Sequence, residues 1–336
     1  MTAEKILLAH GSGGKLTQQL IENIIYPIFK HNDGHDLLDA ALMCIGSSRV
    51  ALTTDSFVIS PIFFPGGDIG KLAACGTIND LAVSGAKPLA LTVSLIVEEG
   101  FPLQDFKKIL VSLKATAEAA GVSVVTGDTK VVEKGNADKI YINTTGIGTV
   151  DDGINLNPKN ITPGDLIVVS GPVGDHGMAI ISQREGIAFQ SPIISDCAAL
   201  NGLTEGVLAS GGILCMRDPT RGGVATTLLE LAEQSQMMFE IKEDNIPVRP
   251  AVTAGCDMLG LDPLYLANEG KLVLIIKPHK EREVLTALSS HPLGKGCEII
   301  GQVTAEDKKG RVLLENSLGV KRLVSKLEGP MLPRIC

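Results

Sequence analysis

Segments with the two-residue spacing of strands alternate with segments of helical spacing along most of the chain, and this alternation is the strongest constraint on the fold. In the first half, a strand pattern in RVALTTDSFVIS precedes helical spacing at about 69–83. A strand pattern in LALTVSLIVE then precedes a helix from about Leu103 to a stop at Gly121, and VSVVTGD and KIYINTTGIGTV complete this half. Such alternation predicts an α/β (α+β) fold, in which helices pack on sheets.

Two elements are predicted before the first of these strands. The apolar stretch KILLA indicates a short strand, and LTQQLIENIIYPIFK has helical spacing. The apolar side chains of this helix fall on one stripe, which consists of Leu16, Leu20, Ile21, Ile24, Ile25 and Ile28. We therefore expect the helix to be packed against the rest of the protein.

The segment DDGINLNPKN is rich in turn-forming residues and divides the chain. A chain of 336 residues is long for one hydrophobic core, so two domains are expected. After the break, DLIVVSGPVG indicates a strand, helices open at DHGMAI and after DPTRGGV, and KLVLIIKP, EIIGQVT and RVLLEN indicate further strands. The sequence predicts domains at 1–152 and 153–318 and a tail at 319–336.

The charge and the cysteines narrow the class of protein. A formal net charge of −8 supplies no broad positive field for nucleic acid or an anionic membrane, so neither partner is expected. We recognise no CxxC pair, signal peptide or membrane-length apolar run, which favours a reduced, cytoplasmic protein. Small or apolar neighbours predict burial of Cys44, Cys75, Cys197, Cys215 and Cys256.

Cys336 is different because it is the last residue of the sequence and follows two prolines and an arginine in PMLPRIC. Proline cannot join a regular backbone ladder, and chain ends are poorly ordered unless something holds them. The pattern fits a thiol on a mobile, semi-stiff arm, and it also fits an accidental cysteine. The rest of the chain has to decide between the two.

Glycine-rich segments suggest nucleotide binding, but the common motifs are incomplete. HGSGGKL has Ala9 where a Walker loop begins with glycine, and Leu16 instead of Ser or Thr follows its lysine. GIGTVD has Asp151 in place of the third glycine of a Rossmann fingerprint. In GDHG, at 174–177, a helix N-terminus suits an anion, although Asp175 fits a simple helix cap equally well.

Aspartates beside small residues recur at predicted element ends, which favours a magnesium nucleotide site. They are Asp55 in TTDSF, Asp80 in TINDLAVSGAKP, Asp128 in TGDTK and Asp218 in RDPTRGGV. Carboxylates are the hard oxygen ligands that Mg²⁺ prefers, and nearby glycines let the backbone approach phosphates. Each aspartate alone fits a cap or turn, so the prediction depends on the set. The positive charge of Lys130 could offset the negative charge of a triphosphate. Glu269 in LANEGKL is a candidate base or a strand-edge acid.

Together these segments resemble the HypE family of nickel–iron hydrogenase maturation proteins, in the AIR-synthase-like (PurM-like) ATP-binding superfamily. The resemblance covers nearly the whole chain and is carried by TTDSFVI, FFPGGDIGKLAACGTINDLAVSGAKP, GVSVVTGDTKVV, GDHG, RDPTRGGV, NEGKL and PRIC. It implies an N-terminal domain whose mixed sheet forms a barrel in a homodimer. It also implies a C-terminal α/β domain that closes over the nucleotide, and a mobile tail.

The same resemblance implies a reaction, partners and site residues. Cys336 would receive a carbamoyl group from the carbamoyltransferase HypF, and ATP-dependent dehydration would convert the thiocarbamate to a thiocyanate. The cyanide would pass to iron on a HypC–HypD scaffold. The catalytic residues would be Cys336, Glu269, Lys130 and Asp80. Matching motifs imply that ATP and Mg²⁺ are bound by Asp55, Asn79, Asp80, Gly127, Asp128, Thr129, Lys130, Asp218, Gly222 and Gly223, with Asp55, Asp80, Asp128 and Asp218 as metal ligands.

Two other functions fit part of the pattern. A selenophosphate or aminoimidazole ribonucleotide synthetase would share the superfamily motifs. The first carries a reactive Cys or selenocysteine near HGSGGK, and residues 11–15 contain none; the second offers no task for Cys336. A non-catalytic thiol carrier would use nucleotide only to control the position of the tail.

Overall fold

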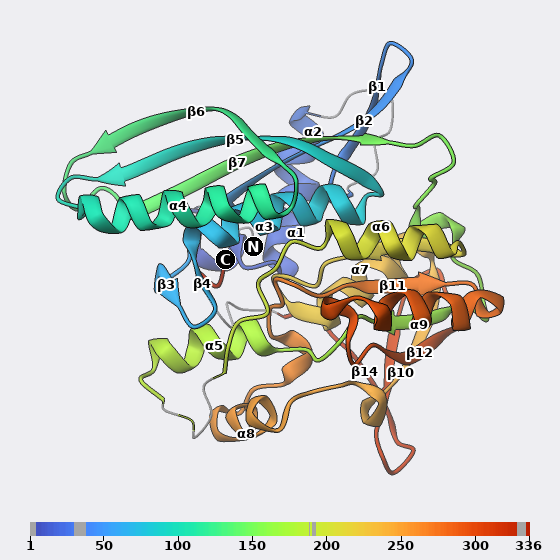
Figure 1. Cartoon of the computed structure of the whole chain (residues 1–336). Helices are drawn as coiled ribbons and strands as arrows, with labels where there is room; N and C mark the ends of the chain where they lie inside the picture. Colours follow the sequence, from blue (N-terminus) through green and yellow to red (C-terminus); the bar gives the residue numbers. More distant parts are fainter. Residues whose placement is uncertain (1–4, 30–37, 188, 190–192, 328–333) are drawn as a thin grey trace.

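The computed structural model describes residues 5–29, 38–187, 189, 193–327 and 334–336. The chain forms two α/β halves, each built on its own mixed sheet (Figure 1). The expected fold class is confirmed. The label C, at the end of the chain, lies between the two halves, close to α3 (Ile69–Val83) (Figure 1).

The N-terminal sheet has the strand order β1-β2-β7-β5-β6. Its strands are β1 (Ala41–Ile45), β2 (Ser48–Phe57), β5 (Ala86–Glu98), β6 (Ser123–Val132) and β7 (Ile140–Val150). The β5–β6 pair is parallel and the other neighbours are antiparallel. The helices α3 and α4 (Leu103–Ala119) lie on one face, and in the described part of the single chain the opposite face of β5–β7 is bare (Figure 1).

The helix α3 connects this sheet to the C-terminal half. A short hairpin of β3 (Phe63–Phe64) and β4 (Gly67–Asp68) leads into it, and the Asp68 carboxylate caps its first turn by accepting from the backbone N–H groups of Gly70 and Lys71. Nearly every α3 residue is buried, because the helix packs on the sheet and also on α6 (Asn201–Ser210). Polar side chains on α3 therefore lie inside the protein, between the halves.

The C-terminal sheet has the order β14-β13-β10-β12-β8-β11-β9. Its strands are β8 (Leu166–Val169), β9 (Ile213–Arg217), β10 (Met237–Lys242), β11 (Val273–Ile276), β12 (Glu298–Glu306), β13 (Val312–Glu315) and β14 (Lys321–Leu323). The other helices of this half are α5 (Asp175–Arg184), α7 (Gly223–Ser235), α8 (Pro250–Leu259) and α9 (Glu281–Ser290). All four β11 residues are buried, because Val273 and Ile275 pack in the cluster that contains α7 residues, and Leu274 packs with α6 and α9.

The structure corrects two predictions near the N-terminus. Part of KILLA forms a 3-10 helix, η1 (Leu8–Gly11), instead of a strand. The predicted helix is present as α1 (Lys15–Leu20), the π-helical turn η2 (Ile21–Ile25) and α2 (Tyr26–Phe29), but none of its residues is buried. Helical spacing identifies an apolar stripe without showing that a surface is available to cover it.

Cys44 was also predicted to be buried and is exposed, whereas the other four cysteines of that prediction are buried. It lies on β1, which among the described strands pairs with β2 alone and forms an edge of the sheet. The strand β14 falls within the segment 319–336 that the sequence predicted as tail. Within the described ranges, the helices lack the combination of length and apolar character that a bilayer span requires.

Candidate nucleotide and thiol site

A cluster of carboxylates lies where α3 meets the C-terminal half. Oxygen atoms of Asp39, Asp80 and Asp218 lie within 4.8 Å of one another. Asp80 accepts a hydrogen bond of 2.8 Å from the Thr53 hydroxyl on β2. Thr53 and Asp55 share a face of β2. The Asp55 carboxylate accepts a hydrogen bond of 3.2 Å from a threonine hydroxyl of α3. The fold thus brings together three of the four predicted aspartates, from β2, α3 and the segment after β9.

Asp39 was missed by the sequence analysis, although a signal was present. It stands beside two alanines in LLDAAL, immediately before a strand, which is the pattern used to select the other aspartates. Its carboxylate lies 2.8 Å from Nε of Arg217, at the end of β9. That ion pair connects the N-terminal sheet to the C-terminal half.

Burial and mutual repulsion disfavour the ionised form of the carboxyl groups in this cluster. Burial raises the pKa of Asp39 to about 6 and that of Asp218 to about 7. Burial likewise raises the pKa of Asp80 well above its ordinary value, and the negative charges of Asp55, Asp218 and Asp39 add to the rise. A divalent cation would remove this repulsion, and carboxylate oxygens are suitable ligands for magnesium.

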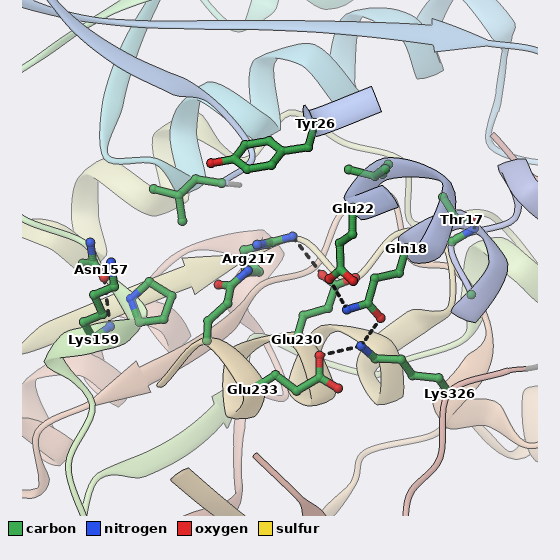
Figure 2. A pocket seen from close by; sticks show the side chains of 16 residues that line it. Thr17, Gln18, Glu22, Tyr26, Asn157, Lys159, Arg217, Glu230, Glu233 and Lys326 are labelled. Atoms are coloured by element: carbon green, nitrogen blue, oxygen red, sulfur yellow. Dashed lines mark hydrogen bonds and ion pairs between the residues drawn. The ribbon is translucent and has the colours of Figure 1, made fainter. Parts of the chain in front are cut away.

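A cavity of about 670 Å³ adjoins the cluster through Arg217 (Figure 2). One wall is the N-terminal helical segment with Gln18, and the other is α7 with Glu230 and Glu233. Lys326 closes one side by bridging Gln18 at 2.6 Å and Glu233 at 2.5 Å (Figure 2). The volume is that of a small-molecule site, so the cavity could hold the nucleoside part of a nucleotide whose phosphates lie at the aspartates.

Cys336 is docked beside the carboxylates. Its backbone oxygen accepts a hydrogen bond of 3.2 Å from the backbone N–H of Val58, just after β2. The side chain packs against the core cluster that includes Cys75 and Cys197. Burial raises the pKa of the Cys336 thiol to about 12; nearby Arg221 opposes this rise, and the charge of Glu269 adds to it. In this position the sulfur is a neutral thiol at physiological pH.

Glu269 is a buried carboxyl group that lies close to this thiol. Its side chain is 1% exposed, and among the described residues its Oε1 atom has no hydrogen-bond partner. Burial raises its pKa well above the ordinary value, and the charges of Asp218 and Asp196 add to the rise. The Asp196 carboxylate accepts a hydrogen bond of 3.0 Å from the backbone N–H of Glu269 and so fixes this residue in place. An unpartnered buried carboxyl beside a docked thiol is a candidate catalytic base.

Three other predicted nucleotide residues hold elements of the site in place. The Asn79 amide donates to the carbonyls of Ala198, at 3.1 Å, and Glu269, at 3.3 Å, so it joins α3 to the segment that carries the candidate base. Gly222 (φ +79°) precedes α7. A Cβ on Gly223 (φ +61°) would lie 2.5 Å from two backbone oxygens of 264–266, so the close approach of α7 to that segment requires glycine. Contact of these three residues with a nucleotide stays a prediction.

The remaining predicted residues lie apart from the cluster in the single chain. They are Gly127, Asp128, Thr129 and Lys130, all exposed on the edge strand β6. Asp128 pairs with Ser94 of β5 and Lys130 with the residue two further on, so both side chains share one face, where they form an ion pair of 2.7 Å. Asp55 points to the opposite face, toward α3. One chain alone does not bring Asp128 and Lys130 to the other aspartates.

Comparison with known proteins places these features in a family. Models described as AIR synthase related protein, N-terminal domain and C-terminal domain, match residues 38–150 and 162–313. The carbamoyl dehydratase HypE of Rhizobium leguminosarum bv. viciae is 48% identical over 334 residues, which is 99% of this chain and 95% of that protein.

Two solved structures are similar over nearly the whole chain. A HypE–HypF complex contains a chain that is 47% identical, with a TM-score of 0.86 over 92% of this chain and 99% of that one. A hydrogenase maturation protein HypE in complex with ATP is 44% identical, with a TM-score of 0.83 over 99% of this chain and 100% of that one.

Proposed function

Because this chain belongs to the HypE family of AIR synthase related proteins, we infer that it is an ATP-dependent carbamoyl dehydratase of hydrogenase maturation. It converts a carbamoyl group carried on sulfur into a cyano group, the source of the cyanide ligand of the hydrogenase iron. The observation that carries this conclusion is the thiol of Cys336, docked beside the buried carboxyl of Glu269 and the aspartate cluster. The groups that we propose as substrate sulfur, base and phosphate-binding ligands are therefore neighbours, which supports this function.

The chemistry requires ATP because an amide oxygen is a poor leaving group. The carbonyl oxygen of the S-carbamoyl group attacks the γ-phosphorus, ADP leaves, and the oxygen becomes a phosphate ester. Glu269, as the proposed base, takes a proton from the amide nitrogen, and the C–O bond breaks to release phosphate. Loss of the second N–H proton completes the carbon–nitrogen triple bond. The oxygen leaves in phosphate, and both hydrogens leave as protons.

We propose that magnesium binds to the aspartates of the cluster. Support comes from the donor set, in which half-buried Asp39 and Asp80 and buried Asp218 offer carboxylate oxygens within 4.8 Å of one another. When bound, the metal would neutralise phosphate charge. The raised pKa values of these groups without a cation agree with a site that is built for one.

Replacing Asp80 or Asp218 with asparagine is expected to weaken Mg-ATP binding at least about tenfold, because each change removes a charged ligand. Calorimetry with and without excess chelator measures this, and the chelator should remove most of the difference between variant and wild type. The matched control is Asp152→Asn, in an exposed turn. Unchanged affinity in both cluster variants would contradict the assignment.

The docked thiol also bears on the partners. A thiolate is the reactive form of cysteine, and a thiol with a pKa of about 12 supplies very little of it at neutral pH. We therefore propose that HypF carbamoylates Cys336 while it is outside the site, and the related HypE–HypF complex supports HypF as the partner. Delivery of cyanide to a HypC–HypD scaffold, and a cytoplasmic location, are proposed from the family resemblance; the seven free cysteines suit a reducing compartment.

We propose that a second copy of the chain covers the bare face and open edge of the N-terminal sheet. The edge strand β6 exposes Val125 (62%) and Val131 (68%), and Ile96 on the bare face of β5 is 43% exposed. An unpaired strand edge next to exposed apolar residues is a pairing surface. In such a dimer, Asp128 and Lys130 of one copy would serve the site of the other, which accounts for their separation from the cluster in the single chain.

Complementation between two inactive variants tests this arrangement. Chains with Lys130→Ala and chains with Glu269→Gln are co-expressed, and the mixture is confirmed as dimeric by sedimentation. If Lys130 acts on the partner's site, random pairing leaves about a quarter of all sites intact, and dehydration recovers to about that level. Each variant expressed alone is the control. A co-expressed mixture as inactive as the single variants would place Lys130 in the site of its own chain.

A further inference from the structure

The last three residues are held by backbone hydrogen bonds on one side and by a buried imidazole on the other. The backbone N–H groups of Ser60 and Val58 donate to the backbone oxygens of Arg334 and Cys336, each at 3.2 Å. Between them, the carbonyl oxygen of Ile335 lies 2.8 Å from Nε2 of His176, on the first turn of α5. One backbone oxygen of each of these three residues therefore has a hydrogen-bond partner.

The hydrogen bonds of His176 define its tautomer. A carbonyl oxygen only accepts, so Nε2 carries the proton and donates it to Ile335. Nδ1 then accepts a hydrogen bond of 2.8 Å from the Ser195 hydroxyl. The oxygen of the same hydroxyl accepts a hydrogen bond of 3.1 Å from the backbone N–H of Cys197. The ring is fully buried, it packs edge-on against Phe64, and burial lowers its pKa. It is a neutral, preoriented donor aimed at the peptide bond next to the reactive thiol.

We propose that His176 is a positioning residue that holds Cys336 in the dehydration site by donating to the Ile335 carbonyl. This inference rests on the proposed function, in which the arm alternates between HypF and the site. When the arm leaves, a buried N–H group loses its partner, so the bond biases the equilibrium toward docking. It also fixes the Ile335–Cys336 peptide plane, which restricts the positions that the neighbouring sulfur can take. Because the contact is to backbone, it is available to both the carbamoylated and the cyanated arm.

Two substitutions separate the donor from the rest of the ring. His176→Gln places an amide N–H near the position of Nε2, whereas His176→Asn reaches only the Nδ1 side and has no donor for Ile335. The measurement is the rate of Cys336 alkylation by iodoacetamide without nucleotide. It is read by mass spectrometry on the peptide 327–336, which cleavage after Lys326 releases.

We expect alkylation of Cys336 in His176→Asn to be at least about tenfold faster than in wild type, as the docked population falls, and His176→Gln to stay within about threefold. Labelling of the exposed Cys44 is the internal control and should not change. Equal Cys336 rates in wild type and His176→Asn would overturn the proposal. A failed dehydratase assignment would leave these alkylation rates unaffected, so the two ideas fail separately.

A second measurement excludes a general loss of structure. For the purified S-carbamoyl protein, single-turnover dehydration should slow in His176→Asn and recover in His176→Gln, while carbamoylation by HypF is not slowed in either. If His176→Asn does not fold, Ser195→Ala keeps the ring but removes the hydroxyl that orients it, and should give a smaller rise in Cys336 alkylation. Slower carbamoylation together with slower dehydration would contradict the proposed role of His176. An unchanged Cys336 alkylation rate in Ser195→Ala would contradict it as well.

Discussion

Replacing Cys336 with alanine is expected to eliminate both the carbamoyl adduct and its dehydration product, while ATP affinity changes less than about twofold. The reason is that, in the proposed mechanism, the Cys336 sulfur carries the substrate, whereas the proposed ATP ligands are carboxylates on other segments. The intact mass of the protein after incubation with HypF, a carbamoyl donor and ATP reports the adduct. In wild type, addition of ATP should remove the mass of one water from it.

Cys297→Ala is the matched control for this experiment. Cys297 is also partly exposed, but it packs with α9 in the C-terminal half and not beside the aspartates. This variant should keep the adduct and its dehydration. A carbamoyl adduct that persists on the Cys336→Ala protein would show that another residue carries the substrate, and the role of the arm would have to be abandoned.

Replacing Glu269 with glutamine is expected to leave carbamoylation intact and to slow dehydration at least about 100-fold, which is the usual lower range for loss of a general base. Glutamine keeps the size of the buried side chain but cannot accept a proton at neutral pH. In the wild-type protein, the raised pKa of Glu269 suits a base that works in a water-poor site. The carbamoylated protein should therefore accumulate, and this is visible as an adduct that does not lose water when ATP is added.

This substitution also separates the enzyme from a non-catalytic thiol carrier. In a carrier, Glu269→Gln would still deliver the carbamoyl load, and ATP hydrolysis would not depend on that load. Glu243→Gln, at an exposed position, is the control and should behave like wild type. Dehydration at the wild-type rate in Glu269→Gln would show that a different group removes the protons.

Much of the fold was predictable because it depends on local periodicity. The helix α3 has the predicted bounds 69–83, and the buried strand β11 lies within KLVLIIKP. The N-terminal helix shows where this reasoning stops. Its apolar stripe predicted burial, but Ile28 is 70% exposed in the single chain, since spacing along one helix contains no information about the surface opposite it.

The candidate site was partly predictable for a related reason. Asp55, Asp80 and Asp218 were selected by their small neighbours, and the fold brings them together; Asp39 matched the same pattern and was overlooked. The position of Asp128 could not be predicted from the sequence, because its separation from the cluster depends on which face of β6 it occupies and on which strand lies at the sheet edge.

By itself, the sequence determined most of the element types, the division into two α/β halves and the chemical identity of the groups, because periodicity and residue type are local properties. Only the tertiary structure decided which groups meet. The pairing of His176 with the Ile335 carbonyl joins residues 159 positions apart, and the high pKa of the Cys336 thiol results from burial by segments remote in the chain. Contacts and desolvation depend on distance in space, which a linear pattern does not contain.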